Sequence, residues 1–494
     1  MRTAEGFTKF GKFSIAADKQ VYGELRVAGT QTSLYLQDDA FFDTHSVPDG
    51  CVAGTLYDLT KVTLIHCLTM EAGSGWRDGD QYHFAKLFPH FVLEGRRHIG
   101  PNDRAIVESS FVLEDATALF YDFDAFGTVI DAVPHIERIA TANKLNRPIP
   151  IGPEPQIAYF AGRRNIIEAD TVLGKVRAQH NPGWSLGGPS GVRIDNVISV
   201  SIEAEPPAAF DEAISRKLRL LRFLELVIGR PQNLHELVIY VDTGDHREPL
   251  KVHWSHRPSR DADSTDDRGS PQPADLLLDP IGRSEEFAGV MRAWLEMDEE
   301  RQDARGRFHV SFAHQRRYSV ERLVGAANMF DILPTSAAPK DVELSEEVLD
   351  AKRRCREIFG ALPDSDERSG VLNALGRVGK LSLKHKTRHR ARYVVDAIGD
   401  RFPDLVSVLN AAVDCRNHYV HGSASKIDYS KNFDMLAFFT DTLEFVFAAS
   451  ELIEAGWNIR TFIETGTTMS HPFGAYRVNY DTQLQTLKAL LAKR

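Results

Sequence analysis

The chain has 494 residues, which is too long for one ordinary hydrophobic core and predicts two or three domains. Hydrophobic residues make up 43% of it and charged residues 26%, a composition that excludes a disordered or fibrous protein. The formal net charge of −10 excludes a protein that coats nucleic acid non-specifically, because such proteins need strongly basic domains to neutralise phosphates. Any contact with nucleic acid is therefore expected to be local.

Cysteine spacing and hydropathy exclude several further classes. The four cysteines lie far apart and form no CxxC pair, so we expect no zinc site and no disulfide framework. The sequence has no GxxxxGK[ST] phosphate loop and no GxGxxG after a strand, and we expect no cofactor. No window of about 18 uninterrupted apolar residues occurs, and the segment from Met1 to Gly11 lacks the apolar core of a signal peptide. We therefore expect no membrane segment and a cytoplasmic location.

A two-residue hydrophobic period dominates residues 1–204. Val21, Leu25 and Val27 fall on one face of an expected strand, with polar or larger side chains between them. Gly, Pro and Asp clusters separate the β-rich runs and indicate turns. Further such runs are 62–68, 91–94, 106–113 and 197–204. The pattern predicts an antiparallel β-sandwich or barrel as the N-terminal domain.

The period changes to that of a helix after Pro206 and Pro207. Phe210, Ile214 and Leu218 begin an apolar stripe at spacings of three and four residues, which is typical of an amphipathic helix. Residues 205–335 are thus expected to form a mainly helical connecting region. It also contains short β-like runs at 237–241 and 252–254 and a polar loop at 259–274.

Helical periodicity continues to the end of the chain, so residues 336–494 are predicted to form an all-α helical bundle. The class is therefore α+β and multidomain. Helices are expected at roughly 284–301, 319–331, 343–359, 367–378, 388–399, 404–421, 431–455 and 478–492.

The segment Arg416-Asn417-His418-Tyr419-Val420-His421 carries the chemistry that the sequence predicts. The apolar stripe of the 404–421 helix continues to Arg416, whose charge then needs a partner or a cleft. Asn417 and His421 share a helix face at i and i+4, so the amide can orient the imidazole. Gly422 is a natural helix stop and leaves His421 on the last turn.

An imidazole and a guanidinium are what metal-independent RNA cleavage requires. The imidazole can move the proton of a 2′-hydroxyl, and the guanidinium can hold the phosphate as its charge grows. On an ideal helix Arg416 and His421 lie about 140° apart. They would converge through the reach of the arginine, distortion at the helix end, or a second subunit, and we favour a dimer.

The spacing alone is weak, since Arg-x4-His is expected by chance about one and a half times in a chain of this composition. Arg230 and His235 share it, but Pro231 and strand-like residues follow Arg230. Asparagine directly after the arginine lowers the chance expectation to roughly 0.04. The alternative remains that Arg416 caps carbonyl groups and His421 is an ordinary helix-end histidine.

Arg416, Asn417 and His421 match the Arg-polar-x3-His motif of HEPN domains, so this part of the chain resembles a HEPN ribonuclease. The wider layout resembles ApeA-type abortive-infection proteins, in which a β-rich N-terminal domain precedes an ApeA-like HEPN domain. The residues that resemble the opening of that N-terminal domain are Phe10, Gly11, Phe13, Val21, Gly23, Glu24 and Leu25. The resemblance implies a homodimer that cleaves RNA, with tRNA as an expected target, after a phage-derived trigger acts on the N-terminal domain.

Weaker signals lie near the motif. A basic run could steer an RNA backbone, although such runs are usually solvated helix faces. Its members are Lys384, Lys386, Arg388, Arg390 and Arg392. His385 and His389 are interleaved at i and i+4, but the neighbouring cations disfavour a metal ion. Tyr419 could stack on an unpaired base or pack in the core.

We thus expect an anti-phage effector whose helical half is an endoribonuclease that leaves 2′,3′-cyclic phosphate and 5′-hydroxyl ends. The β-rich half is expected to sense the phage-derived trigger or to restrain the helical half. Two alternatives stay open. One is a non-catalytic HEPN-like module that binds RNA or protein. The other is a ligand-binding β-sandwich whose helices serve for oligomerisation.

Overall fold

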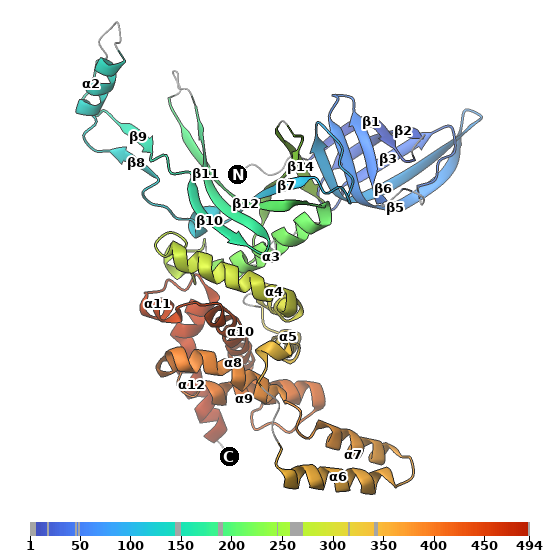
Figure 1. Cartoon of the computed structure of the whole chain (residues 1–494), viewed down its shortest axis with the longest axis vertical. Helices are drawn as coiled ribbons and strands as arrows, with labels where there is room; N and C mark the ends of the chain where they lie inside the picture. The colour runs from blue at the N-terminus through green and yellow to red at the C-terminus, as the bar shows by residue number, and fades with distance from the viewer. Residues whose placement is uncertain are drawn as a thin grey trace. The chain divides into compact units, whose positions relative to one another are not determined.

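The computed structural model describes residues 6–16, 19–44, 47, 50–143, 150–185, 191–244, 246–256, 270–314, 317–339 and 344–492. The chain divides into two compact units (Figure 1). The β unit comprises Met1–Leu221, Pro231–Ser264 and Asp279–Ala288. The helical unit comprises Arg222–Arg230, Thr265–Leu278 and Gly289–Arg494.

The first six strands of the β unit form a closed antiparallel barrel. They are β1 (Phe7–Ser14), β2 (Gln20–Val27), β3 (Ser33–Asp38), β4 (Val52–Leu56), β5 (Lys61–Arg77) and β6 (Asp80–Gly95). The order β6-β3-β2-β1-β4-β5 closes because β5 pairs with β6 as well as with β4. The predicted antiparallel β-rich domain is thereby confirmed, and its first part is a barrel.

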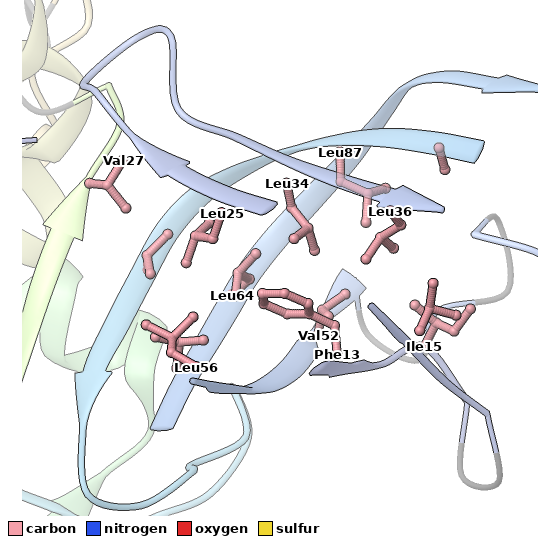
Figure 2. Close-up of a cluster of buried hydrophobic side chains, with 14 of the residues drawn as sticks. Phe13, Ile15, Leu25, Val27, Leu34, Leu36, Val52, Leu56, Leu64 and Leu87 are labelled. Carbon is pink, nitrogen blue, oxygen red and sulfur yellow. The ribbon is translucent and has the colours of Figure 1, made fainter. Parts of the chain in front are cut away.

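Alternate side chains of these strands fill the barrel (Figure 2). Phe13, Leu25 and Leu36 are fully buried there, and Leu64 lies beside the Phe13 ring. Gly54 makes room for that ring, because a Cβ at this position would lie 2.4 Å from Phe13 Cδ1. The two-residue period seen in the sequence is thus the alternation between the barrel interior and its outer face.

The sheet continues beyond the barrel because β6 also pairs with a further strand, β14. From there the order is β14 (Arg247–Trp254), β13 (Leu234–Asp242), β7 (Ile106–Leu113), β12 (Ile194–Ala208), β11 (Gly174–Trp184) and β10 (Asn165–Thr171). The β-like runs at 237–241 and 252–254 are therefore strands of this sheet. The sheet does not end at residue 204, where the sequence predicted the domain boundary.

The remaining elements of the β unit are short, apart from one long helix. They are α1 (Ala116–Leu119), β8 (Phe126–Val129), α2 (Val133–Ala142), β9 (Ile157–Phe160) and α3 (Phe210–Ile228), which crosses into the helical unit. β8 and β9 form a separate two-stranded sheet that carries α2 (Figure 1). Of the predicted polar loop at 259–274, residues 259–269 lie outside the described residues.

The helical unit contains the helices that the sequence predicted and one short one that it did not, α11. They are α4 (Ser284–Ala313), α5 (Val320–Asp331), α6 (Glu346–Gly360), α7 (Asp366–Arg377), α8 (Leu383–Ile398), α9 (Leu405–His421), α10 (Asp434–Glu454), α11 (Ile459–Glu464) and α12 (Pro472–Ala492). α10 is buried along most of its length and packs against α5, α8, α9 and α12. The predicted all-α bundle is confirmed, but most of α4 and all of α5, which the sequence assigned to the connecting region 205–335, belong to the same helical unit.

A buried ionic network joins three of these helices. The Glu451 carboxylate of α10 accepts hydrogen bonds from Arg301 Nη1 at 2.9 Å, Arg305 Nε at 3.0 Å and Arg390 Nη2 at 2.8 Å. Glu454 accepts from Arg301 and Arg390 as well. All three guanidinium groups are buried. The structure therefore corrects one prediction, because Arg390 is fully buried in α8 and is not available to hold RNA.

Candidate functional site

The helix that carries the motif, α9, begins at Leu405 and ends at His421, as the sequence predicted to within one residue. Its buried face includes Leu409, Ala412 and Val413. Gly422 follows with φ 65° and its N–H bonds to the His418 carbonyl oxygen, so it forms the left-handed C-cap. His421 therefore stands on the last turn, exposed to solvent.

The Arg416 guanidinium is the centre of a cluster of side chains. Its Nη1 lies 3.1 Å from His421 Nε2 and 3.1 Å from Asn417 Oδ1. Its Nη2 donates to Asn328 Oδ1, also at 3.1 Å. Arg416 and His421 thus converge within one chain, although their Cα directions diverge on the helix. Of the three routes to convergence that the sequence left open, the structure shows the reach of the arginine, and the second subunit that we favoured is not required to bring the two side chains together.

The contacts define which groups remain reactive. For Arg416 to donate to His421 Nε2, that nitrogen must carry no proton, which places the proton of the neutral ring on Nδ1. Asn417 accepts from Arg416, so in this geometry the amide orients the guanidinium and not, as predicted, the imidazole. Arg416 Nε is buried without a hydrogen-bond partner among the described residues.

Asn328 is the member of the cluster that sequence reasoning missed. It lies on α5, 88 residues before Arg416 in the chain. No sequence pattern links a single asparagine to a motif this far along the chain, so the sequence could not identify Asn328. The bond fixes the guanidinium from a second helix.

The two lysines of the predicted basic run are engaged by acidic side chains of neighbouring helices. Lys384 Nζ lies 2.6 Å from Asp414 Oδ1 on α9. Lys386 Nζ lies 2.7 Å from the carbonyl oxygen and 3.4 Å from the carboxylate of Asp331, the last residue of α5. Both side chains are only partly exposed, so these contacts fasten α8 to the helices that carry the cluster.

The arginines of the run divide into three kinds. Arg388 Nε donates to Asn410 Oδ1 at 2.8 Å, again linking α8 to α9. Arg390 belongs to the buried network. Arg392 is exposed. The structure therefore brings the run next to the motif helix, but leaves few of its charges free for a phosphate backbone.

Two family models match the chain. Residues 324–460 match the Apea-like HEPN model, and residues 9–294, more than half of the chain, match ApeA N-terminal domain 1. The chain belongs to the ApeA family. No curated protein and no solved structure matched it.

The ApeA assignment confirms the resemblance seen in the sequence. It places the chain in a defence-related family of HEPN nucleases and supports ribonuclease activity in general terms. HEPN domains commonly bind RNA and dimerise. Asn328, Arg416, Asn417 and His421 all lie within the residues that match the HEPN model.

Aromatic side chains flank the ApeA motif helix. The Tyr419 ring is 37% exposed, and its centroid lies 5.3 Å from that of His418 and 5.8 Å from that of Tyr429. Tyr429 is buried, and burial raises its pKa. Burial also raises the pKa of Tyr419, which is less enclosed. Tyr419 therefore presents a ring to solvent beside the cluster, whereas Tyr429 is a core residue.

No group of three or more His, Cys, Asp or Glu side chains is placed to hold a metal ion in the described part of this ApeA chain. His385 serves a structural role, since it forms a capping box with Ser382 at the start of α8. Among the helices that the structure describes, none has the length and apolar character needed to cross a bilayer.

Proposed function

We propose that this protein is an anti-phage abortive-infection effector that cleaves RNA through Arg416 and His421 without a metal ion. The observation that carries the proposal is the 3.1 Å contact between the guanidinium and the imidazole inside the HEPN-matched residues. In the same proposal, tRNA is a target and the β unit responds to a phage-derived trigger or restrains the helical unit.

The proposed chemistry assigns one step to each group. His421 Nε2 takes the proton of the ribose 2′-hydroxyl, the 2′-oxygen attacks the phosphorus, and the bond to the 5′-oxygen breaks. The imidazolium then returns a proton to the leaving oxygen. Arg416 holds the phosphate through the two-pronged donor geometry of its guanidinium and stabilises the added negative charge. The phosphate replaces His421 as the acceptor on Nη1, which frees Nε2 to act as a base.

The test is cleavage of unstructured RNA and tRNA by the purified full chain in buffer with a chelator of divalent metals. We expect products that carry 2′,3′-cyclic phosphate and 5′-hydroxyl ends, because the 2′-oxygen and not a metal-bound water is the nucleophile. The ends can be read by phosphatase and kinase treatment. Cleavage that requires added divalent metal, or that leaves 5′-phosphate ends, would contradict the proposal.

Asn328 acts in this proposal as a positioning residue for Arg416. Asn328→Ala removes the acceptor on Arg416 Nη2, and one hydrogen bond to a charged group is worth about a tenfold change. We expect kcat/KM for RNA to fall by about that factor, with a rise in KM and a much smaller fall in kcat than in His421→Ala, since the proton-transfer group is intact. Asn328→Gln should recover part of the affinity.

Asn479→Ala is the control for that variant, because this asparagine on α12 donates to the Ala475 carbonyl oxygen within its own helix. An Asn328→Ala protein with the KM of the wild type would show that the α5 contact does not position the guanidinium. Steady-state kinetics over a range of RNA concentrations separates KM from kcat.

A dimer through the HEPN helices remains part of the proposal. Since Arg416, Asn417 and His421 meet in one chain, a second copy is not required to complete the cluster. Pairing of two copies would instead set two such clusters near one RNA molecule. Sedimentation of the full chain measures the stoichiometry directly.

A further inference from the structure

The outer face of the barrel carries aromatic rings in an ordered arrangement. On β1, β2, β3 and β6 the outward positions form two cross-strand rows in which aromatic and polar side chains alternate. The rows are Lys12, Tyr22, Gln37, Phe84 and Phe10, Glu24, Tyr35, Lys86. Each of the four adjacent strands carries one ring, and the rings alternate between the two rows, so they form a zigzag across the sheet face. We call Phe10, Tyr22, Tyr35 and Phe84 the ring platform.

Three rings of the platform are open to solvent, and Phe84 is half-buried. Phe10 is 55% exposed, Tyr22 57% and Tyr35 40%. The Tyr35 and Phe84 rings lie nearly parallel, at an interplanar angle of 21° with centroids 6.3 Å apart. Several exposed rings on one face of a sheet are uncommon on a protein surface and indicate an interaction site. The nearly parallel Tyr35 and Phe84 rings, on neighbouring strands, offer faces on which planar groups can stack.

Cations accompany the rings. Lys12 Nζ lies 5.4 Å from the Tyr22 ring centroid, and Lys86 is exposed beside Tyr35 in the second row. Arg26 is exposed on β2. Glu24 is the acidic member of the two rows, and the exposed Glu71 of β5 is the cross-strand partner of Lys86. Three cations therefore outnumber two carboxylates on this face, in a chain whose formal charge is −10.

We propose that the ring platform binds single-stranded nucleic acid, with bases stacked on the rings and phosphates beside Lys12, Lys86 and Arg26. Stacking platforms with interspersed cations suit unpaired strands, because every base has a face that can stack. A protein partner fits less well, since lysine is depleted in protein interfaces. The site lies on the β unit and does not depend on the cleavage chemistry proposed for Arg416 and His421.

Binding to the full-length protein tests the platform. The probes are fluorescent 12-residue strands of 2′-O-methyl RNA and of DNA, neither of which has a free 2′-hydroxyl and so neither can be cleaved by the proposed chemistry. An RNA duplex is the third probe. We expect both single strands to bind and the duplex to bind at least tenfold more weakly, because its bases are not available for stacking. A difference between the two single strands would show which sugar the site prefers.

Tyr35→Ala is expected to weaken single-strand binding by about 5- to 100-fold, the range for loss of one stacking ring. Tyr159→Ala is the matched control, because Tyr159 is 44% exposed and lies on β9, in the separate two-stranded sheet. With about three phosphate contacts the slope of log affinity against log salt should be about −2, and Lys86→Ala should make it shallower by about 0.7.

Several results would overturn the inference. One is the absence of single-strand binding by the wild type. Another is equal binding by the wild type and Tyr35→Ala, which would place any binding elsewhere, including at Arg416. Duplex binding as tight as single-strand binding would also overturn it. So would competition for the platform by a glycan or a protein but not by a single strand. The cleavage assay tests Arg416 and His421, and its outcome does not depend on any of these binding results.

Discussion

Replacing Glu451 by alanine is expected to lower the free energy of unfolding of the helical unit by about 3–5 kcal/mol. The carboxylate accepts hydrogen bonds from Arg301, Arg305 and Arg390, and none of these groups has access to bulk water. Removal of the Glu451 carboxylate leaves the buried guanidinium groups with less negative charge nearby. The loss of stability from these poorly compensated charges exceeds the stabilisation that the ion pairs themselves contribute. Urea denaturation followed by the helical circular dichroism signal measures the change.

The control for this variant breaks an exposed ion pair in the same unit. Asp414→Ala removes the partner of Lys384, and the Asp414 side chain is 60% exposed. We expect a loss of less than about 1 kcal/mol there, because solvent screens the pair. If Glu451→Ala and Asp414→Ala unfold at the same urea concentration, the network does not stabilise the bundle as argued. A Glu451→Ala chain that fails to fold would agree with the expectation, and Glu451→Gln then provides a milder variant to measure.

The same network gives the bundle a pH dependence. Burial alone would raise the pKa of Glu454, but hydrogen bonds from Arg301 and Arg390 outweigh it and lower the pKa to about 2. The folded pKa lies below the unfolded one, so the stabilisation is fully present above the ordinary carboxyl range and is lost as pH falls toward 2. Denaturation midpoints measured between pH 5 and pH 3 should therefore decrease.

The buried network also shows where sequence reasoning reached its limit. The run that contains Arg390 looked like one solvated face, because a charge run alone does not tell which member points inward. The usable signal was on α10, where Glu451 and Glu454 stand three residues apart at the end of a highly apolar helix. Carboxylates in such a helix need buried cations, and arginines at one-turn spacing on neighbouring helices are the natural candidates.

The sequence predicted the strands of the β unit but not the closure of the first six into a barrel. The two-residue period identified strands such as β2 and β7 correctly, because alternation reports local burial. Closure of the barrel depends on β5 pairing with both β4 and β6, and extension of the sheet depends on the pairing of β14 with β6. Such non-local pairings leave no mark in a local period, so the sequence could not decide between a sandwich and a barrel or place the boundary beyond residue 204.

At the candidate site the sequence identified three of the four clustered side chains. It assigned Asn417 to the imidazole, whereas the amide contacts the guanidinium. Arg416, Asn417 and His421 follow from the helix and its glycine cap, which are local features. The bond from Arg416 to Asn328 arises from the packing of α5 against α9 and could not be predicted locally. The angle between the two positions on the helix could not decide between the reach of the arginine and a second subunit, because the conformation of a long side chain depends on its neighbours.

His421→Ala is expected to lower kcat for RNA cleavage by about 10²–10⁴, the usual contribution of a positioned acid–base group. The substitution should leave the stability of the fold almost unchanged, because His421 is exposed at the end of α9. His418→Ala is the matched control on the same helical turn, since His418 Nδ1 contacts the Ser423 carbonyl oxygen and not Arg416. Equal cleavage by His421→Ala and the wild type would remove His421 from the mechanism.

The kinetic constants distinguish the two roles in this cluster. His421→Ala leaves Arg416 free to hold a phosphate, so kcat should fall while KM changes little or decreases. Asn328→Ala disturbs the guanidinium and leaves the imidazole in place, so KM should rise and kcat should fall far less than in His421→Ala. If Asn328→Ala instead lowers kcat as much as His421→Ala and leaves KM unchanged, phosphate binding and proton transfer are not divided between Arg416 and His421.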